Sequence, residues 1–290
     1  MQEYLYSLLE ACLIVISAPL LLGITKKTKA LMQNRSGPSI VQPYYDLHKW
    51  WRKDMTIAKI ASLIFIAAPL VYMSTALIAA LLISASGEAS HTGDIFVILY
   101  FLAAGRFMMT LAALDTATTF GGMGASRELF IATLIEPIML IGVMNITSVL
   151  GSTAMSGMLD FSSMQQLNLS SALAMIGFFM LLLAENGRVP VDNPDTHLEL
   201  TMVHEGMLLE YSGKLLSMIN LATYIKQLIF YIIFSRLFFI GDFPVWLKVI
   251  VTAVLVGVAE TLNNKMRLFR IPYYIAIAGI LFILSTLTRY

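Results

Sequence analysis

The sequence predicts an all-α polytopic membrane protein with about eight transmembrane helices and both termini outside. Hydrophobic residues make up 58% of the 290 residues and the mean hydropathy is +0.78, whereas soluble domains are about 45–50% apolar. A helix needs about 20 apolar residues to cross the lipid core. Eight runs meet this need approximately, at 4–24, 60–84, 95–114, 129–150, 168–184, 214–240, 245–262 and 271–288.

The positions of the basic residues predict which connections face the cytoplasm. Lys and Arg accumulate in cytoplasmic connections. Here they gather in connections one, three, five and seven, whereas connections two and four, at 85–94 and 151–170, contain none. No connection is long enough for a separate globular domain. We therefore expect a single transmembrane domain over residues 1–290, with its first span retained because it lacks the features of a cleaved signal.

Two cytoplasmic connections have informative patterns. The first mixes basic with aromatic residues, Tyr44, Tyr45, Trp50 and Trp51, which is typical of a segment at the lipid headgroups. The third has three glycines in four positions, followed by Ser126, which we expect to cap the next helix, and Glu128 in its first turn. Because no strand precedes these glycines, they do not form a dinucleotide-binding motif.

The fifth connection carries the strongest functional signal. Residues 185–213 read ENGRVPVDNPDTHLELTMVHEGMLLEYSG and contain a single basic residue, Arg188. Six of the chain's 18 carboxylates lie there: Glu185, Asp192, Asp195, Glu199, Glu205 and Glu210. Pro190 and Pro194 exclude a continuous helix across the first part, and Asn193 is expected to cap a helix that begins at Pro194.

Ionisable residues also occur within the predicted spans or at their ends. They are Glu10, Arg106, Asp115, Glu128, Glu136, Lys226, Arg236 and Glu260. An isolated charge in lipid costs about 2.5–3.5 kcal/mol on insertion scales, so we expect these groups to face water or paired charges. Each of these residues also has a structural alternative: Arg106 would neutralise a carboxylate, and Lys226 would extend its amine to the membrane interface. For the acidic segment we favour ion movement, because it lacks the cations that structural pairing needs.

The chain is expected to hold no redox centre of its own. Cys12 is the only cysteine, and iron–sulfur clusters usually need four thiolates. All four histidines lie in connections rather than within spans, so a haem between membrane helices has no ligands. We therefore expect no cofactor and no metal in this chain, and any redox metal must belong to a partner.

The segment AENGRVPVDNPDTHLEL, followed by LEYSG, resembles the fifth-connection motif of the complex I membrane protein beside the quinone chamber, the NADH dehydrogenase subunit 1 family. The resemblance covers essentially the whole chain and includes an Arg-x-Gly-Pro turn at Arg35, Gly37 and Pro38. Four features depart from the complex I pattern and are similar to the homologous subunit of group 4 energy-converting, membrane-bound nickel–iron hydrogenases. They are the shorter stretch after Pro38, His197 where complex I members usually have an acid, GASRE at 124–128, and Glu136-Pro137.

The resemblance implies a non-catalytic membrane anchor and coupling subunit of a hydrogenase-like respiratory complex in the prokaryotic cytoplasmic (inner) membrane. Peripheral hydrogenase large and small subunits and a ferredoxin-like subunit, with nickel–iron and iron–sulfur centres, would dock on the cytoplasmic connections. Antiporter-like membrane subunits would move protons or sodium, and no nucleic acid is implied. The docking residues would be Arg35, Asp46, Lys49 and Arg188, and the proton pathway would use Glu185, Asp192, Asp195, Glu199, Glu205, Glu210, Asp115, Glu128 and Glu136.

Two alternatives stay open. A quinone-site membrane subunit of a complex I-type dehydrogenase predicts a lipid-open cavity near the first and fifth connections. A stand-alone secondary transporter would use the acidic segment as a cation site. The lack of an evident internal repeat argues mildly against the transporter.

Overall fold

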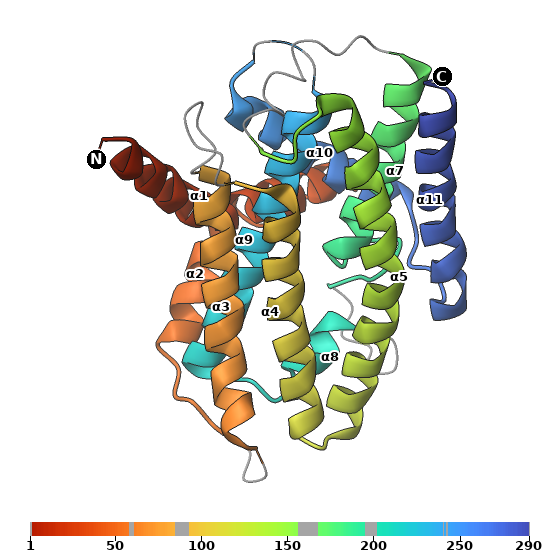
Figure 1. The fold of residues 1–290 in the computed structure, drawn as a ribbon. Coiled ribbons are helices and arrows are strands. Elements are labelled where there is room, and N and C mark those ends of the chain that lie inside the picture. Colours follow the sequence, from red (N-terminus) through yellow and green to blue (C-terminus); the bar gives the residue numbers. More distant parts are fainter. Residues whose placement is uncertain are drawn as a thin grey trace.

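The computed structural model describes residues 2–57, 61–84, 93–155, 168–194, 202–239, 241 and 243–289. Over this part of the chain the regular structure is helical (Figure 1). The long helices are α1 (Gln2–Met32), α3 (Leu63–Ser84), α4 (Ile95–Asp115), α5 (Thr119–Leu150), α7 (Leu169–Glu185), α9 (Gly213–Phe238), α10 (Val245–Leu262) and α11 (Ile271–Leu287). Shorter elements are α2 (Gln42–Trp51), α8 (His204–Leu208) and the 3₁₀ turn η1 (Leu268–Arg270).

The helices have the lengths that a membrane-spanning bundle requires. Seven in the described part are long and apolar enough to cross a bilayer, and α7 is a further apolar helix of 17 residues. The predicted all-α polytopic membrane fold is therefore confirmed. The chain is a multi-pass membrane protein.

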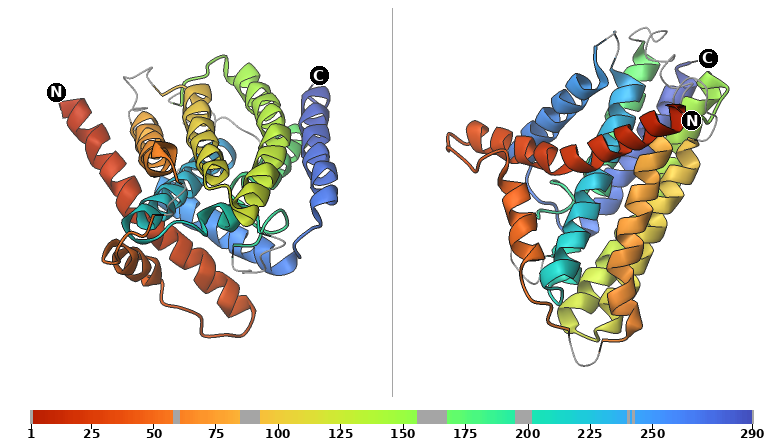
Figure 2. Two further views of the ribbon diagram at one scale, coloured as in Figure 1. Left: turned by 90° about the horizontal axis from the view of Figure 1, so that it is seen from below. Right: turned by 90° about the vertical axis from the view of Figure 1, so that its left-hand side faces the viewer.

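The packing places most helices in one bundle, with α1 crossing it. Helix α3 lies against α4 and α9, α4 against α5, and α11 against α7 and α5. Helix α1 runs at a steep angle to the others and packs on α10, α3 and α9 (Figure 2). Four alanines of α3 are fully buried, Ala68, Ala76, Ala79 and Ala80, and such small residues let membrane helices approach closely.

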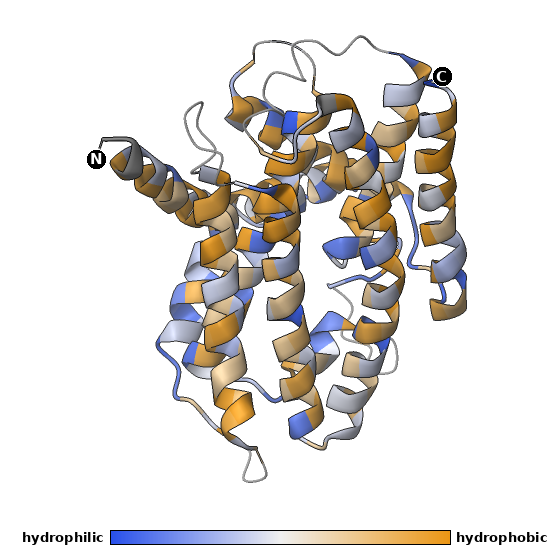
Figure 3. Cartoon of the chain, viewed as in Figure 1, coloured by the Kyte–Doolittle hydropathy of each residue, from blue (hydrophilic) through white to orange (hydrophobic). Residues whose placement is uncertain are grey.

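Polar residues are concentrated at one end of the bundle and inside it. Both termini lie toward one end, and α8 and the α4–α5 turn lie at the other (Figure 1). The outer helices α3, α4, α5 and α11 are mostly apolar, whereas hydrophilic residues gather on α2, α8 and the end of α7 (Figure 3). The apolar lipid-facing surface, with the buried charges kept inside the bundle, follows from the cost of exposing charge to hydrocarbon.

The prediction for the third connection was wrong in its helix boundary. Helix α5 begins at Thr119 rather than near residue 129, and the Thr118 hydroxyl caps it by accepting a hydrogen bond from the Gly121 amide. Ser126 therefore lies within the helix and does not cap it. A Cβ on Gly124 would lie 2.9 Å from the Val203 carbonyl oxygen, so glycine lets α8 pack here, and this tertiary contact overrides the low helix propensity of glycine.

Other boundaries differ by smaller amounts. Helix α1 continues to Met32, beyond the predicted end at residue 24, and α2 forms within the first connection. The turns over 186–194 confirm that the two prolines interrupt the helix. The helix expected from Pro194, with Asp195, His197 and Glu199, lies beyond residue 194, outside the described residues.

Candidate functional site

A cavity of about 370 Å³ lies at the carboxyl end of α7. Its walls come from α1, α2, α3, α4, α5, α8 and α9 and from the turns of the fifth connection. The charged residues and histidine that line it are Lys26, Asp46, Arg106, Glu128, Glu185, Arg188, Asp192, His204, Glu205 and Lys226. The cavity therefore joins the acidic segment to ionisable groups from the spans.

Glu185 is the centre of a buried cluster of charges on the cavity wall. Its carboxylate lies 2.8 Å from Arg106 Nη1 and 2.9 Å from Lys226 Nζ. Arg106 also contacts Glu136 through Nη2, at 3.0 Å. The Glu185 and Lys226 side chains are 4% and 8% exposed, so this carboxylate is neutralised by cations from two neighbouring helices.

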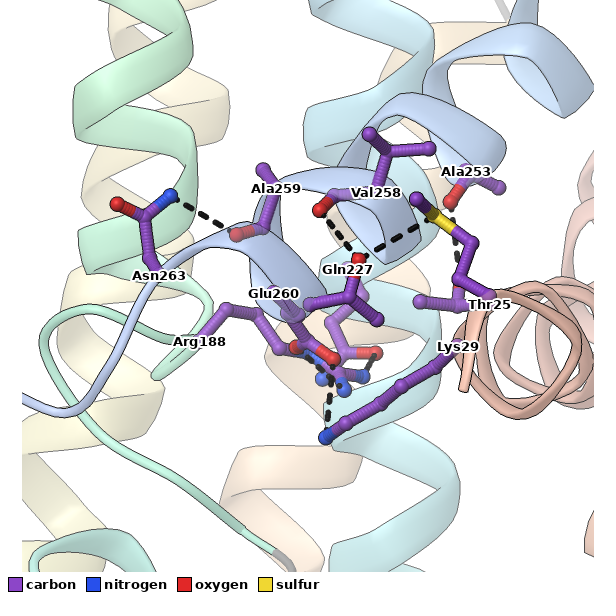
Figure 4. A network of polar contacts seen from close by, with 11 residues as sticks. Thr25, Lys29, Arg188, Gln227, Ala253, Val258, Ala259, Glu260 and Asn263 are labelled. Carbon is purple, nitrogen blue, oxygen red and sulfur yellow. Dashed lines mark hydrogen bonds and ion pairs between the residues drawn. The ribbon is translucent and has the colours of Figure 1, made fainter. Parts of the chain in front are cut away.

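Arg188 belongs to a second cluster, on the other side of the fifth connection. It donates from Nη2 to Gln227 Oε1 at 2.8 Å and from Nη1 to Glu260 Oε1 at 3.2 Å. The other oxygen of Glu260 lies 3.5 Å from Lys29 Nζ. Figure 4 shows both cations converging on this single carboxylate of α10. The cluster ties the connection to α1, α9 and α10.

Asp192 is paired as well. Its Oδ1 lies 2.6 Å from Lys265 Nζ, and the Met266 amide donates to the Pro190 carbonyl at 2.8 Å. The expectation that the acidic segment lacks pairing cations was therefore wrong for Glu185 and Asp192. Their partners, Arg106, Lys226 and Lys265, come from elements distant in the sequence.

Other polar groups of the cavity have no partner in the described structure. Glu128 on α5 and Glu205 on α8 line it with no ion pair or hydrogen bond to their side chains. Both amide atoms of the buried Asn186 side chain and Nε2 of His204 are enclosed without a hydrogen-bond partner among the described residues. Buried polar atoms are nearly always satisfied by protein or ordered water, so the cavity suits water or a polar ligand.

Most of the remaining predicted site residues lie away from this cavity. Asp115 accepts a hydrogen bond from the Ser62 amide at 2.7 Å, and Glu210 does not line the cavity. Asp46 lines it, but Arg35 and Lys49 are exposed at the surface. The Glu136 side chain is 48% exposed and borders a second, small cavity of about 60 Å³ between α4 and α5.

The Glu-Tyr-Ser-Gly motif fastens the start of α9 to neighbouring segments. The Tyr211 ring stacks on Phe65 with centroids 4.1 Å apart, and its hydroxyl donates to the Phe65 carbonyl at 3.0 Å. Burial, aided by the charge of Asp115, raises the pKa of Tyr211. The Ser212 hydroxyl accepts from the Thr56 amide at 2.8 Å. Gly213 has φ +58° and leaves no space for a Cβ beside the Lys53 and Asp54 carbonyls.

The sequence patterns did not identify the carboxylate partners of three cations, Lys226, Lys29 and Lys265. For Lys226 they left open both pairing inside the bundle and snorkelling to the interface. The structure buries Lys226 and pairs all three with carboxylates. The available signal for Lys226 was its place in the middle of an apolar span, where a charge needs a partner.

Comparison with known sequences gives consistent matches over most of the chain. The pattern of the NADH dehydrogenase family matches residues 5–290. Hydrogenase-4 component C of Escherichia coli (strain K12) is 32% identical over 239 residues, which cover 81% of this chain and 75% of that protein. Formate hydrogenlyase subunit 4 of the same organism is 31% identical, over 83% of this chain and 78% of its own length. The H subunit of NADH-quinone oxidoreductase from Rhodospirillum centenum is 30% identical, over 80% and 71%.

A solved structure has the same fold. A chain of the membrane-bound sulfane sulfur reductase, an archaeal respiratory membrane complex, superposes with a TM-score of 0.84 and covers 98% of this chain and 100% of its own. The two sequences are 20% identical, so this likeness concerns the fold.

Proposed function

Because this chain belongs to the NADH dehydrogenase family and is homologous to membrane subunits of group 4 hydrogenases and of complex I, we propose that it anchors and couples a hydrogenase-like respiratory complex. The names of these relatives describe components of multisubunit complexes. In this proposal, docked subunits reduce protons with electrons from ferredoxin or formate, and the membrane part moves protons or sodium.

The observation that carries the proposal is the division of the cavity's carboxylates into paired and unpaired groups. Glu185 and Asp192 have fixed cationic partners. Glu128 and Glu205 make no ion pair or hydrogen bond with their side chains in the described structure, although the charge of Glu128 acts on Arg106, so either can take up a proton without breaking an ion pair. Carboxylates whose charges interact strongly titrate as a coupled group, and in this proposal a charge that arrives in a docked subunit changes the proton occupancy of the cavity.

The geometry supports a route from the cavity into the membrane. Glu205 on α8 and Glu128 on α5 would receive protons from the cavity. Arg106 contacts Glu185 on the cavity side and Glu136 on the outer side. A proton or charge displacement could thus pass from the α8 end to the lipid-facing side of α5. Asp195, Glu199 and Glu210 stay predicted members of the acidic group.

Partners and location follow from the same proposal. The end that carries α2 and α8 would face the cytoplasm of a prokaryotic cell and receive the peripheral subunits, with both termini outside. Nickel–iron and iron–sulfur centres would lie in those subunits. Arg35 and Lys49 are exposed and would contact them. Antiporter-like subunits would pack on the membrane-facing sides.

The test is ion translocation by membrane vesicles that contain the assembled complex. Glu128→Gln and Glu205→Gln should each reduce the translocated charge per turnover several-fold, while hydrogen production by the uncoupled complex continues. Asp54→Asn, an exposed position outside the cavity, serves as the control. Unchanged coupling in both cavity variants would remove these residues from the mechanism.

One observation favours a second candidate, a quinone-site subunit of a complex I-type dehydrogenase. The cavity lies between the first and fifth connections and includes the apolar Leu22, Trp50 and Leu216 in its walls. Metal analysis of the purified complex separates the two candidates. Stoichiometric nickel supports the hydrogenase, whereas absence of nickel with inhibition by quinone analogues supports the dehydrogenase.

A further inference from the structure

We infer that Arg267 and Arg270 form a binding site for the phosphate of an anionic phospholipid, at the bilayer boundary where α11 begins. Arg267 directly precedes η1 and Arg270 ends it. Both side chains are exposed. The inference goes beyond the proposed function and does not depend on which side of the membrane faces the cytoplasm.

The length of the last span places η1 at the edge of the hydrocarbon layer. The apolar span that contains α11 runs over the 20 residues from Leu268 to Leu287. At 1.5 Å per residue this is about 30 Å, which is the thickness of the hydrocarbon core. Figure 1 shows α11 at the periphery of the bundle, and its start lies at the end of this helix opposite the C-terminus. The two arginines therefore lie at the level of the lipid headgroups.

Exposed aromatic side chains beside the arginines indicate contact with lipid. Phe269 is 84% exposed and Tyr273 is 73% exposed. Neighbouring side chains fix this segment to the bundle, since Ile271 is buried and the Tyr274 hydroxyl donates to the Met180 carbonyl at 3.2 Å. Aromatic residues are enriched at membrane interfaces, where their apolar part contacts acyl chains. The exposed side of this segment therefore suits the bilayer rather than open water.

The positive charge of this segment is unbalanced in the described structure. Lys265 is paired with Asp192. Arg267 and Arg270 have no ion pair or hydrogen bond to their side chains among the described residues, and residues 263–274 contain no acid. A guanidinium donates two parallel hydrogen bonds to phosphate oxygens. A phosphate group of the surrounding bilayer therefore supplies the acceptors and the negative charge that this segment lacks.

The site adjoins the segment that holds the cavity wall. The Met266 amide, next to Arg267, donates to the Pro190 carbonyl at 2.8 Å, and Lys265 contacts Asp192 at 2.6 Å. A headgroup bound to Arg267 would restrain this segment against the fifth connection. Because a ligand that binds the folded state stabilises it, anionic lipid should raise the unfolding temperature of the complex.

Photo-crosslinking tests the site in the assembled complex. The complex is placed in phosphatidylcholine vesicles that contain a small fraction of phosphatidylglycerol with a photoreactive group near its headgroup. This lipid should label residues 268–274 more than phosphatidylcholine with the same group does, by about fivefold for each arginine. The preference should decrease at high salt. Equal labelling by the two lipids would overturn the inference, and absence of labelling by either would show that a protein subunit covers the patch.

A charge-removing variant tests the two arginines themselves. Arg267→Gln with Arg270→Gln should abolish the preference for phosphatidylglycerol, whereas the exposed aromatic rings should still contact lipid. The matched control is Arg52→Gln with Lys53→Gln, which removes the same charge from an exposed pair after α2. This control should label residues 268–274 as the wild type does. A preference that persists in the first variant would contradict the site.

Thermal unfolding provides a second measurement. Phosphatidylglycerol should raise the unfolding temperature of the wild-type complex above its value in phosphatidylcholine alone, and should raise it less in Arg267→Gln with Arg270→Gln. An equal rise in the two proteins would contradict a stabilising headgroup at this site. If the variant assembles poorly, the comparison of the two photoreactive lipids on the wild-type complex decides the question.

Discussion

Glu185 illustrates how a charge can be buried in a membrane protein at moderate energetic cost. Its two oxygens are shared between Arg106 and Lys226, and Arg106 is shared in turn with Glu136. The four groups sum to zero net charge, so the cluster avoids an isolated ion in hydrocarbon. Removing one partner leaves an uncompensated buried charge, which costs more than removing a complete pair.

Lys226→Met should therefore destabilise the protein by about 3–5 kcal/mol. Lys248 provides a matched control, because it is similarly buried but donates to a neutral carbonyl, that of Phe239, at 2.9 Å. Lys248→Met should cost less, on the order of 2 kcal/mol. Thermal unfolding of the purified complex measures the difference. Adding Glu185→Gln to Lys226→Met should recover part of the loss, and equal losses in the two single variants would contradict this account.

Tyr211 gives a prediction for alkaline pH. Burial raises its pKa above the ordinary value near 10, so the folded state favours the neutral hydroxyl. This contribution to stability is fully present below pH 10 and decreases as the pH rises toward the folded-state pKa. Tyr211→Phe should be less stable at neutral pH, because the hydrogen bond to Phe65 is lost, yet should lose less stability between about pH 10 and 11. Thermal unfolding midpoints across this range provide the measurement, and parallel pH profiles would exclude the effect.

At the scale of elements, hydropathy predicted the spans because a bilayer imposes a minimum apolar length. It could not predict where α5 begins. The glycines at 121, 122 and 124 indicate a loop by propensity, but α8 packs directly against this part of α5. Tyr211 and Ser212, directly before α9, are likewise held by contacts with Phe65 and Thr56, which lie about 150 residues away in the sequence.

A pair of glycines on α5 tests this packing directly. Gly124→Ala would place a Cβ 2.9 Å from the Val203 carbonyl and 3.1 Å from the Met207 amide nitrogen, so α8 must shift and the protein should be destabilised. Gly122→Ala meets nothing within 4 Å and should stabilise the helix by about 0.5–1 kcal/mol. Opposite signs of the change in unfolding temperature are expected. A neutral Gly124→Ala would mean that α8 does not pack closely against α5.

The acids of the candidate site could be predicted from the sequence, but the cation that pairs with each acid could not. Six carboxylates beside one arginine are visible in the sequence, and their position next to apolar runs indicated a functional group. The pairing of Glu185 with Lys226, and of Asp192 with Lys265, depends on which helices become neighbours. A single sequence does not show which helices become neighbours. Among the acids that line the described cavity, the structure therefore leaves Glu128 and Glu205 without an ion pair or hydrogen bond to their side chains.

For the molecule as a whole, the two charge clusters extend the site across the bundle. One runs from Glu136 on α5 through Arg106 and Glu185 to Lys226. The other runs from Gln227 through Arg188 and Glu260 to Lys29 on α1. Adjacent residues of α9 bring the two together. Ion pairs and hydrogen bonds thus connect the fifth connection to helices on both sides of the bundle. A change of charge at this connection would act on both sides, as the proposed coupling role requires.

The exposure of Glu136 on the side of the bundle predicts that a membrane partner packs there. Nearly half of its side chain is exposed on a face with exposed apolar residues such as Tyr100 and Phe107, and a carboxylate facing lipid is unfavourable. A transmembrane helix of another subunit, with a hydrogen-bond donor at this depth, would satisfy it. A photo-crosslinking residue at position 136 in the assembled complex should couple to a second hydrophobic subunit, and mass spectrometry identifies the product. The same residue at position 280, an exposed site on α11, is the comparison, and crosslinks from position 136 to lipid alone would place this face against the bilayer.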